Sequence, residues 1–184
     1  MRVSIVNLVV DDSSSMGRLG IQSARQAAMQ LLHYVEARDR ETGVAACCSV
    51  WTFASDPIEV GTGLPARELL VIPLVGHGPT MLHRALREVA DATTAAIDRA
   101  RWHAKVRREF KATVSTVLIG DLQGNQPWGE EARRLTDLGS LGLVLVDHGE
   151  PCVLPTPIAL AEFQVVVPAS QLSMEHMRTL INLS

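Results

Sequence analysis

Short runs of apolar residues alternate along the chain with longer segments in which apolar residues recur every three or four positions. The short runs predict β-strands, over residues 5–10, 44–53, 68–75, 113–120, 141–146 and 163–167. The three- and four-residue spacing predicts amphipathic helices, over residues 19–37, 80–102, 127–138 and 170–183. Pro73 favours an edge position for the strand over 68–75. Residues 54–67 are expected to form a loop or an irregular edge.

The alternation of strands and helices predicts an α/β fold, with a doubly wound, mostly parallel central sheet of about six strands and helices on both faces. One short antiparallel strand is expected at the edge of this Rossmann-like sheet. Apolar residues make up 47% of the chain and aromatic residues 4%, a balance typical of aliphatic strands covered on both faces. Because no internal repeat or linker divides the sequence, residues 1–184 are predicted to form a single domain.

The charge balance argues against two classes of partner. The formal net charge is −3, which gives no general case for binding nucleic acid or an anionic membrane. We interpret a basic run over residues 99–111 as a solvated helix face or loop rather than a nucleic-acid contact. No apolar stretch approaches the length of a membrane span, and no signal-type core precedes residue 11. The chain is therefore predicted to be soluble and cytoplasmic.

Cysteine and histidine residues form no recognisable metal motif. Cys47, Cys48 and Cys152 lack C-x-x-C spacing, so free thiols in a reducing compartment are the expected state. The six His residues are scattered and include no H-E-x-x-H pair, which argues against a zinc site.

A loop rich in oxygen-bearing side chains follows the first predicted strand. Asp11, Ser13 and Ser15 alternate along it, so their side chains could converge on one point while Asp12 and Ser14 face elsewhere. Small converging oxygens suit a hard cation such as Mg²⁺ or Mn²⁺. The same residue types also cap helices, and a helix is predicted to follow. Both interpretations are compatible with this loop taken alone.

Two later positions belong to the same edge of the predicted sheet. Thr80 stands at the mouth of a helix, where a helix cap is its simplest role, and Asp121 ends the strand over 113–120. In a doubly wound sheet, ligands bind beyond the carboxyl ends of the strands, where the strand order reverses. Two carboxylates and three hydroxyls would leave a coordination position for water or an incoming carboxylate.

The segment from Asp11 to Gly17 resembles the D-x-S-x-S-M signature of von Willebrand factor A (vWA) domains. Thr80 is similar in position to the isolated Thr of that family, and Asp121 to its isolated Asp. The resemblance runs in order and spacing over nearly the whole chain. It implies the vWA fold and a metal-ion-dependent adhesion site holding Mg²⁺ or Mn²⁺. The implied ligands are Asp11, Ser13, Ser15, Thr80 and Asp121.

Two loop positions depart from the family pattern. Pro79 stands where the family usually has a second Gly, and Leu122 where it has the Gly of a T-D-G triplet. Both changes crowd loops beside the site without removing a coordinating oxygen. Residues 51–54 and 80–86 look most like the bacterial intracellular branch that includes tellurium-resistance proteins of the TerY type.

The resemblance implies a metal-dependent protein-interaction module with no catalytic role. A Glu or Asp carboxylate from a protein partner would complete the metal shell. Kinase or phosphatase components of a bacterial stress or tellurite-resistance system are the implied partners.

Two alternatives stay open. A haloacid-dehalogenase-like phosphohydrolase would use Asp11 as its nucleophile and Gly120-Asp121 as its Mg²⁺ motif. Such phosphatases need a carboxyl general acid at position 13, where this chain has a Ser. The other alternative is a structural vWA domain with a vestigial site, whose hydroxyls serve only as helix caps.

Overall fold

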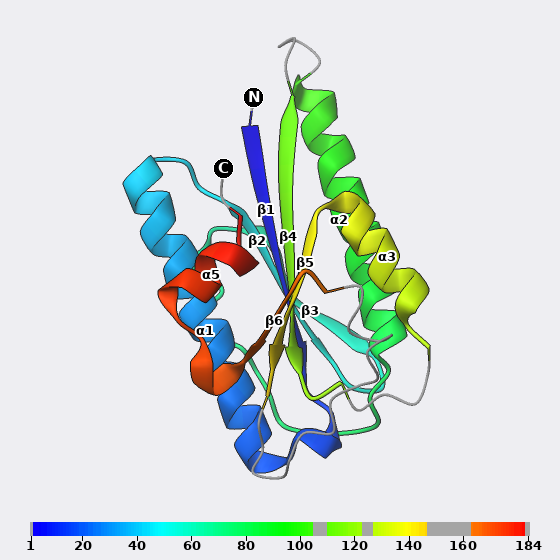
Figure 1. The fold of residues 1–184 in the computed structure, drawn as a ribbon. Helices are drawn as coiled ribbons and strands as arrows, with labels where there is room; N and C mark the ends of the chain where they lie inside the picture. Colours follow the sequence, from blue (N-terminus) through cyan, green and yellow to red (C-terminus); the bar gives the residue numbers. More distant parts are fainter. Residues whose placement is uncertain (1, 105–109, 123–126, 147–162, 183–184) are drawn as a thin grey trace.

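The computed structural model describes residues 2–104, 110–122, 127–146 and 163–182. Within these residues a six-stranded sheet has the order β3-β2-β1-β4-β5-β6 (Figure 1). Its strands are β1 (Arg2–Asp11), β2 (Cys47–Phe53), β3 (Pro57–Leu64), β4 (Lys111–Gly120), β5 (Ser140–Leu145) and β6 (Val165–Pro168). Neighbouring strands are parallel except β2 and β3, which are antiparallel. The predicted α/β fold, with a mostly parallel sheet and one antiparallel edge strand, is confirmed.

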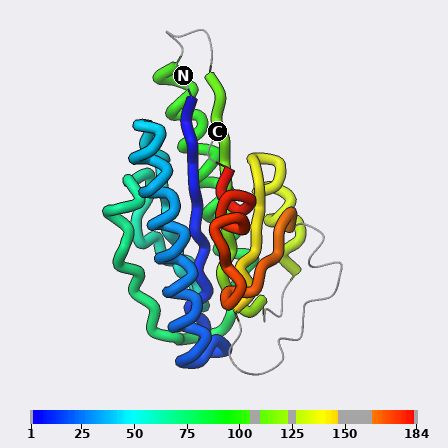
Figure 2. The backbone as a smooth tube through the Cα atoms, turned by 60° about the vertical axis from the view of Figure 1, so that its left-hand side comes forward, coloured from blue at the N-terminus to red at the C-terminus, as the bar shows by residue number. Residues whose placement is uncertain are grey.

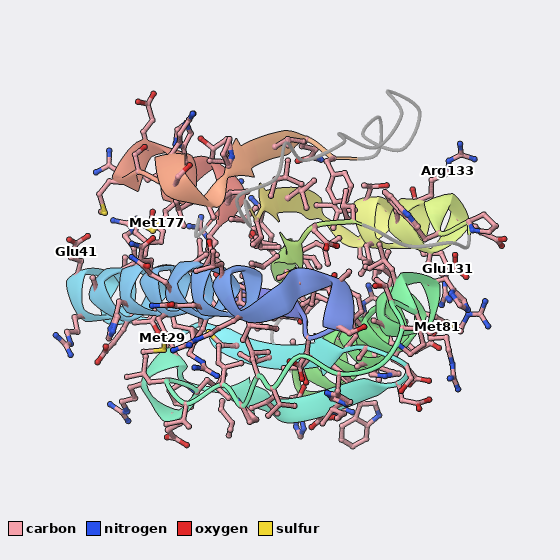
Figure 3. The ribbon with its side chains drawn as sticks, turned by 90° about the horizontal axis from the view of Figure 1, so that it is seen from below. Met29, Glu41, Met81, Glu131, Arg133 and Met177 are labelled. Carbon is pink, nitrogen blue, oxygen red and sulfur yellow. The ribbon has the colours of Figure 1, made fainter. Side chains whose placement is uncertain are left out.

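Helices cover both faces of the sheet. They are α1 (Gly17–Thr42), α2 (Leu82–Ala104), α3 (Gly129–Leu138) and α5 (Met174–Leu180), with short 3-10 turns η1 (Ser14–Met16), η2 (Ala66–Glu68) and η3 (Ala169–Gln171). Helices α1 and α5 lie on one face, and α2 and α3 on the other, as the view along the sheet in Figure 3 also shows. The molecule is therefore a three-layer sandwich.

The central strand β1 divides the hydrophobic core in two. Val6, Leu8 and Val10 are buried against the α1 layer, whereas Val9 belongs to the cluster under α2 and α3. Successive side chains of a strand point to opposite faces, so an almost uninterrupted apolar run is what a strand covered on both sides requires. Position 11 therefore points toward the α2 layer, like position 9.

The edge strand lies earlier in the chain than the sequence predicts. Strand β3 occupies most of the segment expected to form a loop or an irregular edge, and its pairing with β2 has register shifts. Val60 and Leu64 pack inward from it. The predicted strand over 68–75 is wrong. The segment begins in the turn η2, where the Glu68 and Leu69 N–H groups donate to backbone carbonyls. At its end, Asp12 accepts from the Val75 N–H and Arg25 donates to the Leu74 carbonyl, so these two backbone groups are satisfied without a strand partner.

The boundaries of all four helices differ from the prediction, and α2 and α3 each begin two residues later, at Leu82 and Gly129. Helix α1 extends to Thr42 and ends where Gly43 adopts a left-handed conformation with φ of 68°. The last helix begins at Met174 rather than residue 170, because the Ser173 hydroxyl accepts from the His176 N–H and caps it. The turn η3 replaces the beginning of the predicted helix.

Several predictions fall outside the described residues, namely the loop over 147–158, Cys152 and residues 105–109 of the basic run. Cys47 and Cys48 are free thiols, as predicted, and Cys48 is buried, but Cys47 is exposed rather than buried as expected. No helix in the described part of the chain combines the length and apolar character that a membrane span requires.

A buried polar cluster joins the middle of the sheet to α2. The Asn7 side-chain amide on β1 donates to the Thr93 hydroxyl of α2 at 3.0 Å and to the Thr116 hydroxyl of β4 at 3.2 Å. All three residues are at most 2% exposed. Because a buried amide without a partner is costly, these bonds fix α2 against the strands that end at positions 11 and 120.

Replacing Thr93 by Val should lower the free energy of unfolding by about 1–2 kcal/mol, because the Asn7 amide loses one acceptor. Thr94→Val is the matched control. Thr94 also donates to the carbonyl four residues earlier but lies outside the cluster, so its effect should stay within about 0.5 kcal/mol. Urea unfolding measures both. Equal losses in the two variants would show that the cluster contributes nothing.

Candidate metal centre

The candidate site lies where the strand order reverses. The chain order runs outward from β1 in one direction through β2 and in the other through β4. Asp11 is the last residue of β1, and Asp121 directly follows β4. Parallel neighbours end at the same edge, which is where ligands bind in doubly wound sheets. Figure 3 views the molecule from this edge.

Gly120 lets the two strand ends meet. A Cβ atom at position 120 would lie 2.7 Å from the Cβ of Asp11 and 3.0 Å from its Oδ2. Real Cβ atoms do not approach so closely, so the Asp11 side chain occupies the space that only a glycine leaves free. Asp11 is consequently 0% exposed. Asp121, the residue that follows the end of β4, is 1% exposed.

The loop after β1 brings three of the predicted ligands together. The Ser13 N–H donates to Asp11 Oδ1 at 2.9 Å, and the Ser13 and Ser15 hydroxyl oxygens are 2.9 Å apart. Ser13 is fully buried, whereas Ser15 is exposed. The structure therefore brings Ser13 into contact with both Asp11 and Ser15.

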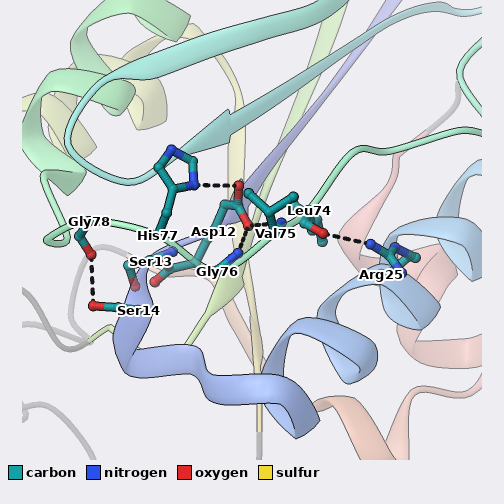
Figure 4. A network of polar contacts seen from close by, with 10 residues as sticks. Asp12, Ser13, Ser14, Arg25, Leu74, Val75, Gly76, His77 and Gly78 are labelled. Atoms are coloured by element: carbon teal, nitrogen blue, oxygen red, sulfur yellow. Dashed lines mark hydrogen bonds and ion pairs between the residues drawn. The ribbon is translucent and has the colours of Figure 1, made fainter.

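Asp12 and Ser14 face the other way, onto residues 74–78 (Figure 4). Asp12 Oδ1 accepts from the N–H groups of Val75 and Gly76, both at 2.7 Å, and Oδ2 lies 3.3 Å from Nδ1 of His77. The Ser14 hydroxyl donates to the Gly78 carbonyl at 2.9 Å. These residues fasten the loop to a neighbouring segment, a role that the sequence interpretation did not assign to them. The sequence signal for this role is the pair of glycines at 76 and 78, which mark a turn. In the structure both have positive φ, a conformation that glycine adopts readily.

Thr80 is partly buried and lies two residues beyond the segment at 74–78 that Asp12 and Ser14 hold in place. On one side, Gly78 accepts from the Ser14 N–H at 3.0 Å, and on the other the Met81 N–H donates to the Ala54 carbonyl at 2.9 Å. These bonds hold the backbone around Thr80 beside the ends of β1 and β2. They position the segment and involve no contact of the Thr80 hydroxyl itself.

Asp121 is close enough to Asp11 for its charge to raise the Asp11 pKa. The following residue, Leu122, has φ of 56° and is buried among the residues under α2 and α3. This left-handed conformation suits glycine and costs a leucine about 1–2 kcal/mol. The backbone therefore keeps the shape of a glycine turn even though the side chain is that of a core residue.

The Asp11 carboxylate is electrostatically unsatisfied. Burial raises its pKa from 3.8 to about 7, the charges of Asp121 and Asp12 add to this, and hydrogen bonds from Ser13 oppose it. Its Oδ2 is buried and has no hydrogen-bond partner in the described part of the protein. A buried carboxylate oxygen needs a proton, a donor or a cation.

The donor set determines which cation could fit. Among the described residues there is no cluster of three or more His, Cys, Asp or Glu side chains that could hold a metal ion. Any cation at this site therefore depends on serine and threonine hydroxyls beside the carboxylates. An all-oxygen set of this kind fits Mg²⁺ or Mn²⁺ and does not fit zinc.

No model of a known protein family matches the sequence, and no curated protein matches it. The fold, in contrast, is similar to solved structures. An aerotolerance-related membrane protein from Bacteroides fragilis is 12% identical with a TM-score of 0.57, over 97% of this chain and 96% of that one. The pilus adhesin SpaC from Lactobacillus rhamnosus is 13% identical with a TM-score of 0.62, over 97% of this chain and 29% of the adhesin.

The von Willebrand factor domain of the type V pilus tip protein Mfa5 from Porphyromonas gingivalis is also similar. It is 14% identical with a TM-score of 0.51, over 66% of this chain and 38% of that one. Together these likenesses show that the chain has the vWA fold. At such low identity they show the fold alone, because one fold carries many functions.

Replacing Gly120 by Ala should lower the free energy of unfolding by about 1–3 kcal/mol, since the new methyl group would push Asp11 out of place. Gly129→Ala is the control, because a Cβ there meets nothing within 4 Å. That substitution, at the start of α3, should be neutral or stabilising by up to about 1 kcal/mol. Thermal unfolding followed by circular dichroism compares the two. A Gly120→Ala protein as stable as Gly129→Ala would contradict the packing described.

In metal-free protein, the contribution of Asp11 to stability should decrease as the pH rises from about 4 to about 7. Its folded-state pKa of about 7 lies above its ordinary value of 3.8, so the unfolded chain holds fewer protons in this window. Above the folded-state pKa the penalty is constant. Relative to Asp11→Asn, the wild type should lose roughly 4 kcal/mol of unfolding free energy between pH 4 and pH 8. Urea unfolding with EDTA measures this, and a pH-independent difference would contradict it.

Proposed function

We propose that this chain is a metal-dependent protein-interaction domain. Mg²⁺ or Mn²⁺ would be held by the side chains of Asp11, Ser13, Ser15, Thr80 and Asp121. The carboxylate of a Glu or Asp from a protein partner would complete the metal shell. The cation supplies a Lewis-acidic attachment point for that carboxylate, and the chain itself has no catalytic role.

The observation that carries the proposal is the buried Asp11 carboxylate. It lies at the switch point of the sheet, its Oδ2 lacks a hydrogen-bond partner within the described residues, and burial raises its pKa to about 7. A cation would provide the missing partner and favour the ionised form. The Ser13 and Ser15 hydroxyls, 2.9 Å apart, lie on the same side of the loop.

The charges of the site favour an acidic partner group. Asp11 and Asp121 together approximately neutralise a dication, and the remaining donors are hydroxyls without charge. A cation held in this way keeps affinity for an additional anionic oxygen. The exposed position of Ser15 leaves the site open to solvent on the side of η1.

Two further points support binding over hydrolysis. Ser13 stands where a phosphohydrolase of the alternative type needs a carboxyl group, and a hydroxyl of ordinary acidity cannot act as a general acid. The similar folds include a pilus adhesin and a pilus tip protein. The setting in tellurite resistance or stress, the kinase or phosphatase partners and the cytoplasmic location rest on the sequence alone and stay predictions.

Isothermal titration with Mg²⁺ and Mn²⁺ tests the metal site. The wild type should bind one cation, and Ser13→Ala should weaken the affinity about tenfold or more, because a metal-facing hydroxyl is lost. Ser14→Ala is the matched control, since Ser14 is the adjacent serine but its hydroxyl contacts Gly78 instead. Its affinity should change about twofold at most.

The same titration separates the alternatives. Asp11→Ala should abolish cation binding and any cation-dependent binding of a protein partner. No heat of binding at millimolar metal in the wild type would identify the site as vestigial. Phosphatase turnover with Mg²⁺ that disappears in Asp11→Asn would replace the proposal with the hydrolase.

A further inference from the structure

An open groove of about 550 Å³ lies beside the proposed metal loop. One wall is the first turns of α1, and the other is the segment at residues 74–76. In Figure 2 this segment belongs to the stretch that runs along the outer side of α1. The groove is lined by Gly17, Arg18, Ile21, Gln22, Arg25, Leu74, Val75 and Gly76.

The groove is held rigidly to the metal loop (Figure 4). Arg25 donates from Nη2 to the Leu74 carbonyl at 2.8 Å and so ties the two walls together. The next two residues donate their N–H groups to Asp12, which lies between the proposed ligands Asp11 and Ser13. Gly76, with φ of 73°, supplies the left-handed backbone conformation at which this wall turns. A ligand in the groove would therefore lie in a fixed relation to the site.

The charge of the groove is opposite to that of the protein. Its lining includes Arg18 and Arg25 and no acidic residue, although the chain as a whole carries a formal charge of −3. Both Arg side chains are exposed. Neither forms an ion pair with a carboxylate among the described residues. The groove also lies at the N-terminal end of α1, where the helix dipole favours anions.

Apolar surface accompanies these charges. Val75 is 75% exposed at the rim, and Ile21 lies in the wall. A surface that combines guanidinium groups with aliphatic side chains is complementary to a peptide of mixed acidic and apolar residues. It suits nucleic acid less well, because the groove lining contains no aromatic side chain on which a base could stack.

We propose that this groove binds an acidic, aliphatic segment of the protein partner. One carboxylate of that segment would reach the cation, and a second would pair with Arg18. The inference deepens the proposed function, because the groove opens beside the loop that would hold the metal. It also makes a separate claim, since the pairing with Arg18 requires no cation.

A short fluorescein-labelled peptide of alternating Glu and Val residues is the probe, with a Gln and Val peptide for comparison. Fluorescence anisotropy with Mn²⁺ should show binding of the Glu peptide only. Arg18→Glu should weaken it about tenfold or more, because attraction becomes repulsion at the groove. An acidic residue in the first turn of a helix is favourable for stability, so this variant should fold.

Arg99→Glu is the matched control. Arg99 is an exposed residue of α2 without an ion pair in the described structure, and the substitution makes the same change in net charge. It should alter the affinity about twofold at most, because Arg99 lies on α2, on the opposite face of the sheet from α1 (Figure 1). Three results would contradict peptide binding in the groove: equal effects of Arg18→Glu and Arg99→Glu, no effect of either, or equal binding of the Gln peptide. So would the absence of any peptide binding.

The two proposals can fail separately. In EDTA the Glu peptide should bind more weakly, and the remaining binding should still depend on Arg18. If metal titration fails but this dependence persists, the groove is upheld and the metal function is lost. If metal binds and Ser13→Ala removes peptide binding while Arg18→Glu does not weaken it, the groove is lost and the metal function is upheld. Displacement of the peptide by single-stranded DNA with equal affinity would replace the acidic partner with a nucleic acid.

Discussion

The burial of one carboxylate at the end of the central strand is the constraint on which the site depends. Asp11 is placed there because β1 is covered on both faces, and Gly120 on the adjacent strand leaves room for its side chain. A buried carboxylate that ionises is destabilising unless something compensates its charge. The loop supplies hydrogen bonds from Ser13 and no positive group, so among the described residues nothing compensates a charge that strand pairing fixes in space.

The loop that surrounds this carboxylate divides its residues between two tasks. Alternate side chains face the site, while Asp12 and Ser14 hold the segment at 74–78 in place. That segment leads into Thr80 and forms one wall of the groove, so its position affects both proposed binding surfaces. Leu122 likewise has two roles. Its backbone is left-handed beside Asp121, and its side chain packs in the core under α2 and α3. Strain tolerated next to a site is a common accompaniment of function.

The similarity to solved vWA structures establishes the fold of this chain but not its function. Identities of 12–14% accompany TM-scores of 0.51–0.62, so topology is retained while almost every side chain differs. What this chain binds must therefore follow from its own donor atoms and charges. In the two proposals made above, the hydroxyl-rich set at the sheet edge and the guanidinium groups beside it would both bind carboxylates of a partner, and both features belong to the same end of the molecule.

The sequence by itself determined the alternation of strands and helices, the mostly parallel sheet and the separation of Asp12 and Ser14 from the other side chains of the loop, because hydrophobic periodicity and local alternation are short-range signals. It misplaced the edge strand, because the Pro and Gly residues of 54–67 obscure alternation, and whether residues 68–75 pair depends on distant side chains. Only the tertiary structure showed that Asp12 fastens the 74–78 segment, that Gly120 accommodates Asp11, and that Arg18 and Arg25 line a groove. Each depends on residues far apart in sequence whose proximity is decided when the strands pair and α1 packs on the sheet.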